Sequence, residues 1–301
     1  MSGRATPPWP GDRPDERFEA DAAHAASATA ATPAVRAADE RLRLAAASGT
    51  PCAPVRDLIG DADQDAAYAV QTLGIERRIA EGRRVIGRKI GLTSTAVQAQ
   101  FGVFAPDYGV LLDDMVAADR EPIALDRFLQ PRVEAEIAFV LGRDLDSPTT
   151  HVADVIRATD FVLPAIEVVD SRIAGWDITI ADTVADNASS GAVVLGTTPR
   201  SLDGLDLTEV GMSLERDGDP VSTGSGVACI GSPVIAVAWL ARAVARHGRP
   251  LRAGEVILSG ALGPMVAATA GVFRARLDGL GEVRADFAAA PTGARTEGAA
   301  A

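Results

Sequence analysis

Two glutamates, Glu134 and Glu136, lie one residue apart in an otherwise apolar stretch, PRVEAEIAFVLG (residues 131–142). Because side chains alternate between the two faces of a strand, both carboxylates point to the same face. At a separation of ~7 Å and an effective dielectric constant of ~20, their mutual repulsion is about 2 kcal/mol. Three arrangements could offset it: a solvated face, a Lys or Arg opposite, or a divalent cation bound by the carboxylate oxygens. Spacing alone favours the solvated face.

More acidic residues follow in LPAIEVVDSR, where Glu167 and Asp170 end a second apolar run. The separation of Glu136 and Glu167 suits a strand, a connection and a neighbouring strand. Glu167 could therefore complete a set of three carboxylates around one cation. Asp170 and Arg172 could equally form an ion pair on the surface.

Other polar residues occur in segments that would suit a site. Lys89 lies between two glycines in GRKIGLTS (87–94), so it is expected either to pair with an acid or to face a site. Asp107 follows a proline in APDYGVL, where an aspartate in a turn is the simpler interpretation. Asn187 and Ser189, in DTVADNASSG, could bind ligand oxygens or belong only to a connecting loop.

Composition and spacing argue against several classes of function. The net charge is -12 and the sequence has no basic, aromatic-rich stripe, which argues against a nucleic-acid partner. Cys52 and Cys229 lack the spacing of a disulfide framework or a thiolate zinc site. The glycine-rich TGSGVACIGS has neither phosphate-loop nor dinucleotide-binding spacing. The two cysteines without a disulfide pattern fit a reducing cytoplasm, which is the expected location. The apolar runs are too short to span a bilayer.

The elements that must position these residues divide the chain into a helical front and a strand-rich remainder. Residues 61–84 have helical apolar spacing, and Ser232 and Pro233 open a late helix that should end at Gly248. The remainder consists mainly of short β-branched runs without βαβ alternation, which predicts an α+β fold in which a helical N-terminal subdomain precedes a mixed, rolled β-sheet domain. The expected boundaries are a disordered tail (1–33), the helical subdomain (34–84), the catalytic domain (85–288) and a second disordered tail (289–301).

Six motifs, taken together and in this order, resemble a known family: GRKIGLTS, PDYGVL, QPRVEAEIAFVLGRDL, PAIEVVDSRI, DTVADNASSG and AVAWLARAVARHGRPLRAGEVILSGAL. The chain resembles the 2-hydroxypenta-2,4-dienoate (2-keto-4-pentenoate) hydratase and 4-oxalocrotonate decarboxylase family of the fumarylacetoacetate hydrolase superfamily over roughly residues 35–287. The resemblance implies a β-rich fold of the fumarylacetoacetase C-terminal type, a Mg2+ or Mn2+ ion, and assembly into a homo-oligomer.

The resemblance also implies roles for individual residues. It places Asp170 in the second acidic motif without making it a metal ligand. The sequence departs from the family at ATAGVFRARL, where relatives often have a Gly-Asp turn. The metal ligands would be Glu134, Glu136 and Glu167, the catalytic residues Lys89 and Asp107, and the residues of a loop near the substrate Ser259 and Gly260. Asn187 and Ser189, from the polar loop described above, are added as candidate substrate-binding residues.

The activity that the resemblance implies is the addition of water to 2-hydroxypenta-2,4-dienoate, giving 4-hydroxy-2-oxopentanoate, in the meta-cleavage catabolism of aromatic rings. The substrate would be a small 2-oxo or 2-hydroxy acid, and the enzyme could associate with other enzymes of its pathway. One alternative is a 4-oxalocrotonate decarboxylase, which would need a cationic or polar pocket for a distal carboxylate. The others are another lyase, hydrolase or tautomerase of the superfamily, and a non-catalytic binding protein.

Overall fold

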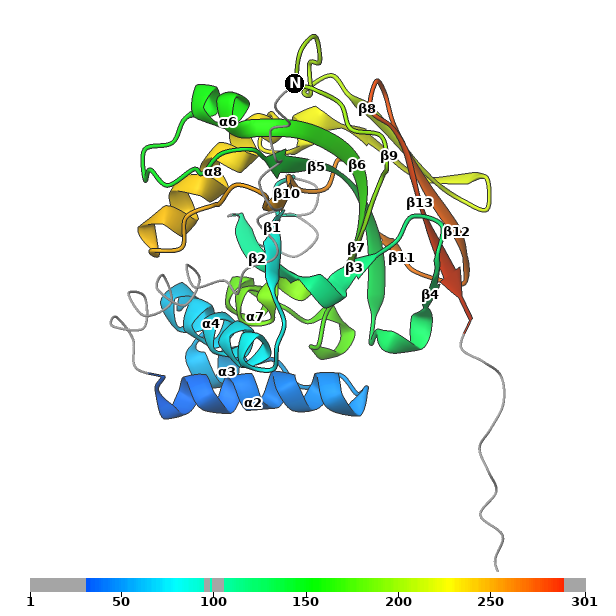
Figure 1. Cartoon of the computed structure of the whole chain (residues 1–301). Helices are drawn as coiled ribbons and strands as arrows, with labels where there is room; N and C mark the ends of the chain where they lie inside the picture. The colour runs from blue at the N-terminus through cyan, green and yellow to red at the C-terminus, as the bar shows by residue number, and fades with distance from the viewer. Residues whose placement is uncertain (1–30, 95–97, 99–105, 290–301) are drawn as a thin grey trace, which may run out of the picture.

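The computed structural model describes residues 31–94, 98 and 106–289 (Figure 1). The tails expected at 1–33 and 289–301 therefore fall almost wholly outside the described residues. Within these residues, helices precede a strongly curved mixed sheet and a second sheet that packs beside it. This arrangement confirms the expected α+β fold.

Helices form the front of the chain, as its apolar spacing predicted. Helix α4 begins after Asp63, whose carboxylate accepts a hydrogen bond from the N–H of Ala66 at 2.9 Å. It buries Ala67, Val70 and Ile75, and it packs against both α2 and the later helix α7. The α-helices are α2 (Pro33–Ser48), α3 (Arg56–Ile59), α4 (Gln64–Ala80), α6 (Val152–Ala158), α7 (Ile180–Ala185) and α8 (Pro233–Arg246).

The larger sheet carries the candidate catalytic and metal-binding residues. Its strands lie in the order β2-β1-β10-β5-β6-β7-β3, and β11 pairs with β5. Strand β6 is antiparallel to both of its neighbours, β5 and β7, whereas β1 and β10 are parallel. The strands are β1 (Val85–Gly91), β2 (Asp107–Leu112), β3 (Val116–Ala117), β5 (Pro131–Leu141), β6 (Thr159–Asp170), β7 (Ser190–Leu195), β10 (Val256–Leu258) and β11 (Val266–Ala267).

The smaller sheet closes the other side of the core. Figure 1 shows its strands beside β6 and β7, on the side away from α2–α4. The rings of Phe273 and Phe287 meet edge to face at 5.5 Å and belong to the same buried cluster as Val133 and Ile137 of the larger sheet. The strand order is β4-β13-β12-β8-β9, with β4 (Pro122–Ala124), β8 (Gly211–Arg216), β9 (Asp219–Ser225), β12 (Gly271–Leu277) and β13 (Gly281–Ala288).

Strand β9 is not predicted by the sequence. Its residues, DPVSTGS, are mostly exposed and carry no alternating apolar pattern, because the strand lies at the edge of the smaller sheet. A two-residue turn sets its position: Asp217 and Gly218 have positive φ values of 52° and 97°, as tight β-hairpins require. Pairing with β8, and not burial, therefore defines this strand.

Helix α8 confirms the predicted late helix, with Pro233 as its first residue and Gly248 in the left-handed conformation beyond its end. Ser232 occupies the N-cap position, although its side chain makes no capping hydrogen bond. By length and composition alone, the segment Gly226–Arg246 could cross a membrane. Its buried residues, however, pack in the main core between the sheet and α6, as in the core helix of a globular protein.

Candidate functional site

Three glutamates meet on one face of the larger sheet. Strands β5 and β6 pair with Glu134 directly opposite Glu167, and Glu136 lies two residues further along β5. One carboxylate oxygen from each glutamate lies within 4.8 Å of the other two. The exposed fractions of Glu134, Glu136 and Glu167 are only 6%, 0% and 1%. The solvated face that spacing alone favoured is therefore wrong.

Lys89, on β1, lies on the same face of the sheet as the glutamates. Its Nζ is 3.3 Å from Oε1 of Glu167, a buried ion pair that lacks the geometry of a hydrogen bond. Burial opposes the charge on Lys89, but the surrounding carboxylates, Glu167 first, outweigh it and raise the pKa of the ammonium group. The ion-pair interpretation is thus confirmed in part, since a single lysine cannot neutralise all three glutamates.

A signal in the sequence for Lys89 was overlooked. It is the one lysine among the 29 Lys and Arg residues of the chain. Arginine is always charged and presents a planar fork, whereas lysine is a compact ammonium whose pKa responds to its surroundings. The single lysine among so many arginines is therefore a feature of the sequence that favours a role for a compact ammonium group at this position.

The electrostatics of the glutamates fit a divalent cation. Burial, followed by repulsion from Glu167, raises the pKa of Glu134 to about 7 and that of Glu136 well above its usual range. Within the described part of the chain, Oε1 of Glu136 and both carboxylate oxygens of Glu167 are buried without a hydrogen-bond donor. Such oxygens are costly to bury alone, but they are the ligands that hard cations such as Mg2+ and Mn2+ prefer.

Asp107 begins strand β2 and is buried, so its interpretation as a turn residue is wrong. Its Oδ2 accepts a hydrogen bond from the Thr183 hydroxyl at 3.1 Å, while Oδ1 has no hydrogen-bond partner among the described residues. Gly91 lies opposite, and a Cβ there would stand 2.1 Å from Oδ1 and 3.6 Å from Nζ of Lys89. Burial raises the pKa of Asp107, although Lys89 and Thr183 oppose the shift. Glycine at position 91 thus lets Asp107 lie beside Lys89.

Asn187 and Ser189 lie in a short 3-10 helix, η5 (Asn187–Ser189), that packs against β2. The Asn187 amide accepts a hydrogen bond from the N–H of Val110 at 2.8 Å and donates one to its carbonyl at 2.9 Å. The Ser189 hydroxyl donates to Asp186 at 3.4 Å. The contacts of Asn187 position the strand that carries Asp107. That Asn187 and Ser189 also bind substrate stays a prediction.

Ser259 and Gly260 lie directly beside the carboxylates. The N–H of Gly260 donates to Oε2 of Glu136 at 2.7 Å, and its φ of 103° is a conformation open mainly to glycine. The N–H of Ser259 donates to the carbonyl of Ile137 at 3.1 Å, which ties this loop to β5. Gly260 therefore orients one metal-ligand candidate through its backbone, and contact of either residue with substrate stays a prediction.

Asp170 and Arg172 do not form the surface pair that the sequence allowed. Asp170 is buried, and its carboxylate accepts hydrogen bonds from the N–H groups of Leu129 and Gln130 at 2.9 Å and 2.6 Å. Arg172 pairs with Asp186 at 2.5 Å instead. The contacts of Asp170 anchor the start of β5 to the end of β6, and so support the register that sets the glutamates opposite each other.

Arg132 also lies near the glutamates, and sequence reasoning missed it. It precedes Glu134 by two residues on β5 and therefore shares its face. Its guanidinium stacks on the ring of Trp176 at 4.4 Å. Its positive charge opposes the rise in the pKa of Glu134, although burial has the larger effect and the pKa stays raised. The same alternation that grouped the glutamates could have identified Arg132.

Comparison with known proteins gives a consistent result. The family model described as "Fumarylacetoacetate (FAA) hydrolase C-terminal" matches residues 86–288. A "TodF product hydratase" from Pseudomonas putida is 59% identical over 263 residues, covering 87% of this chain and 98% of the relative. A 2-keto-4-pentenoate hydratase from Paraburkholderia xenovorans is 58% identical over 251 residues, covering 83% and 93%.

A solved structure shares the architecture as well. The 4-oxalocrotonate decarboxylase from Pseudomonas putida, complexed with magnesium and adipate, is 36% identical in sequence and superimposes with a TM-score of 0.80. The match covers 84% of this chain and 97% of the decarboxylase. From the family match, these relatives and the shared fold, we conclude that the chain belongs to the fumarylacetoacetate hydrolase family.

Proposed function

We propose that this protein is a divalent-metal-dependent hydro-lyase that adds water to 2-hydroxypenta-2,4-dienoate and forms 4-hydroxy-2-oxopentanoate. The main support is the buried set Glu134, Glu136 and Glu167 beside Lys89. A 2-oxo or 2-hydroxy acid offers two oxygens, from C1 and C2, to a cation held by such a set. The hydratase relatives, at 59% and 58% identity, favour this reaction over the decarboxylation carried out by the relative at 36%.

The roles of the residues follow from their positions. The three glutamates would hold the cation, which would supply stabilisation of negative charge on the C2 oxygen of the substrate. Lys89, already paired with Glu167, presents a second positive charge to the same oxygen as charge develops there. Asp107, with one oxygen fixed by Thr183 and the other beside Lys89, transfers the proton.

The proton movements balance in two steps. In the first, the C2 hydroxyl loses its proton and C5 gains one, which gives the α,β-unsaturated 2-oxo acid. In the second, water adds its hydroxyl group to C4 and a proton to C3. Because the pKa of Asp107 is raised, it carries a proton more readily than an exposed aspartate, as a group that accepts and returns a proton should.

The wider setting follows from the same assignment. The cation would be Mg2+ or Mn2+, since both accept the oxygen ligands present. Residues 85–288 would form the catalytic domain and residues 34–84 the helical subdomain, which packs on α7 behind Asp107. The protein would act as a homo-oligomer in the cytoplasm, on the meta-cleavage route of aromatic catabolism.

The test is direct. Purified protein with Mg2+ or Mn2+ should bleach the dienol absorbance of freshly generated 2-hydroxypenta-2,4-dienoate and yield 4-hydroxy-2-oxopentanoate. Glu136→Gln should abolish this turnover, and Glu121→Gln, at an exposed position outside the site, should not. Release of CO2 from 2-oxohex-3-enedioate, without turnover of the dienoate, would identify a decarboxylase instead.

A further inference from the structure

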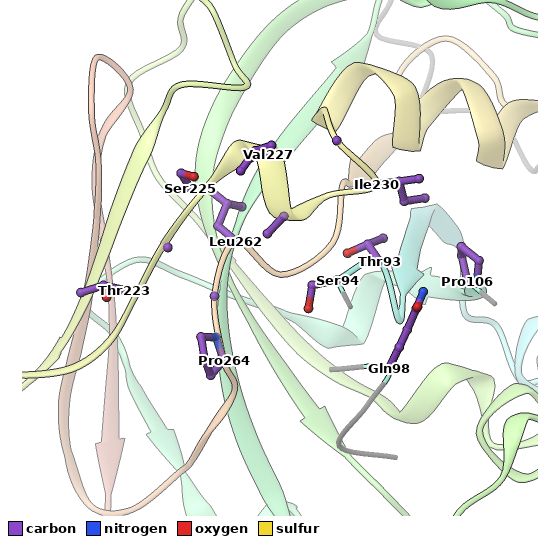
Figure 2. Close-up of a pocket in the computed structure, with 14 residues that line it drawn as sticks. Thr93, Ser94, Gln98, Pro106, Thr223, Ser225, Val227, Ile230, Leu262 and Pro264 are labelled. Carbon is purple, nitrogen blue, oxygen red and sulfur yellow. The ribbon is translucent and has the colours of Figure 1, made fainter. Parts of the chain in front are cut away.

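Asp107 lies at the end of a strand, beside a cleft. It is the first residue of β2, and Pro106 before it lines an open cleft of about 660 Å³ (Figure 2). Gly91, its partner on β1, has no side chain to pack against it. The position of the Asp107 carboxylate therefore depends on the elements that pack against β2.

Gln71 joins two of these elements behind Asp107. Its buried side-chain amide, on α4, donates to the carbonyl of Tyr108 at 2.9 Å and to that of Val184 at 3.1 Å. Tyr108 directly follows Asp107 on β2. Val184 directly follows Thr183 on α7. One side chain thus connects the residues next to both partners of the Asp107–Thr183 hydrogen bond.

Helix α4 also holds Tyr108 through its ring. Tyr68 lies three residues before Gln71 and so on the same side of the helix. The rings of Tyr68 and Tyr108 stack, with centroids 4.5 Å apart and planes at 20°. Because side chains alternate along β2, the Tyr108 ring lies on the face opposite the Asp107 carboxylate. Helix α4 therefore fixes this end of β2 from the side away from the carboxylate.

A second contact anchors α7 on the other side of Thr183. Asp182, the residue before it, accepts hydrogen bonds from the N–H groups of Val55 and Arg56 at 2.8 Å and 2.9 Å. Thr183 thus lies between two anchored residues, Asp182 and Val184. Its hydroxyl reaches β2 only while α7 keeps its distance from that strand, and the amide on α4 bridges this distance.

Glutamine stands out at this position of α4. The other buried residues of the helix, Ala67, Val70 and Ile75, are apolar. A buried amide loses hydration and rotamer freedom, and its two hydrogen bonds do little more than offset that loss. Leucine or methionine would complete the apolar face. What glutamine adds at position 71 is the bridge between β2 and α7.

We infer that Gln71 is a positioning residue for the reaction: its amide sets the spacing of β2 and α7 at which Thr183 holds the Asp107 carboxylate for proton transfer. The inference rests on the proposed function for the role of Asp107. It gives the helical N-terminal subdomain a part in catalysis, through the placement of a group on the sheet. A displacement of a reacting group by about 1 Å can cost about 100-fold in rate.

Two substitutions remove the amide and keep a side chain of similar size. Gln71→Met and Gln71→Leu are both apolar but differ in shape. In each we expect kcat for 2-hydroxypenta-2,4-dienoate to fall roughly 10–100-fold while KM changes by less than about threefold. Wild-type kcat in both variants would overturn the inference. A loss in only one of them would also overturn it, because that loss would follow the shape of the side chain and not the missing amide.

Matched variants separate positioning from loss of stability. Val70→Ala removes a buried side chain from the same helix, so it should lower Tm while kcat well below Tm stays unchanged. Gln64→Met makes the same exchange at an exposed position of α4 and should change neither. If Val70→Ala lowered kcat as much as Gln71→Met, the role of Gln71 would be structural only.

A double variant tests the route from Gln71 to Asp107. Gln71→Met combined with Thr183→Val should have a kcat within about twofold of Thr183→Val alone, because both changes act through the same hydrogen bond. Losses that multiply would refute this route.

Crystal structures give a readout that does not depend on turnover. In Gln71→Met, the distance between Oδ2 of Asp107 and Oγ1 of Thr183 should lengthen from 3.1 Å to beyond about 3.5 Å. An unchanged distance would overturn the inference. If the distance lengthens but the wild type does not hydrate the dienoate, the hydratase proposal fails and the positioning of Asp107 by Gln71 stands. If the wild type and Gln71→Met are equally active, the hydratase proposal stands and the inference fails.

Discussion

Divalent metal should stabilise this protein by an amount that grows with pH. In the metal-free fold the pKa of Glu134 is about 7, against 4.5 for an ordinary glutamate. Between these two values the folded state binds more protons than the unfolded state, so this contribution to stability is complete below pH 4.5 and is lost as the pH rises through 7. The difference corresponds to about 3 kcal/mol.

Burial is the largest cause of this shift in the pKa of Glu134, and repulsion from Glu167 is the second. Two carboxylate charges 4.8 Å apart repel by about 3 kcal/mol at an effective dielectric constant of ~20. A cation that binds the ionised carboxylates removes this penalty and competes with protons for the same oxygens. At a hundredfold excess over its Kd, it stabilises the fold by about 2.7 kcal/mol, a rise in Tm of roughly 5 °C for a chain of this size.

The assay is thermal unfolding of chelator-treated protein at pH 5 to 8, with and without Mg2+ or Mn2+. The rise in Tm on adding metal should be small at pH 5 and reach its full value by pH 8. Glu136→Gln should lose most of this rise. Without metal at pH 8 its Tm should equal or exceed that of the wild type, because a neutral amide of similar size removes repulsion.

Two results would refute this reasoning. A metal-dependent rise in Tm that is the same at pH 5 and pH 8 would mean that protons and metal do not compete for these glutamates. A full rise in Glu136→Gln would place the cation elsewhere.

Three further predictions concern two residues of the candidate site and one buried ion pair outside it. Lys89→Arg keeps the positive charge but not the compact ammonium group, and it should lower kcat/KM at least ~100-fold in the dienol assay. Activity near that of the wild type would mean that only the positive charge of Lys89 matters for the reaction. In steady-state kinetics, Thr183→Val should lower kcat by roughly 10–100-fold with little change in KM, whereas Thr183→Ser should keep kcat near the wild-type value. In an Asp107→Asn background, Thr183→Val should cause no further loss of kcat. Asp182→Ala should lower the free energy of unfolding in urea by about 3–5 kcal/mol, because Asp182 is fully buried and its carboxylate accepts a hydrogen bond from Arg56 at 2.6 Å. As a control, Asp177→Ala, which removes an exposed partner of Arg56, should lower it by less than about 1 kcal/mol.

The strands and the helices with strong apolar spacing could be predicted from the sequence, because local pattern determines them. The face shared by Glu134 and Glu136 follows from strand alternation in the same way. Their burial does not, since it depends on what covers that face. The sequence therefore left a solvated face as the simplest interpretation, and the resemblance to a family was needed to favour a metal site.

Long-range contacts account for what local pattern missed. The pairing of Glu134 with Glu167 depends on register, which Asp170 helps to set through backbone groups some 40 residues earlier in the chain. Thr183 contacts Asp107 from a helix 76 residues away. Neither contact leaves a periodic signal in the sequence.

The apolar face of the same strands explains why the fold can hold three repelling carboxylates. On the side of β5 and β6 opposite the glutamates, Val133, Ile137 and Ile166 are fully buried in the main core. Burial of each such side chain contributes about 1.5–3 kcal/mol, which offsets part of a repulsion of about 3 kcal/mol per glutamate pair. The packed face thus helps to hold the carboxylates in place before any cation binds, and the negative charge that Lys89 does not neutralise attracts a divalent ion to the other face.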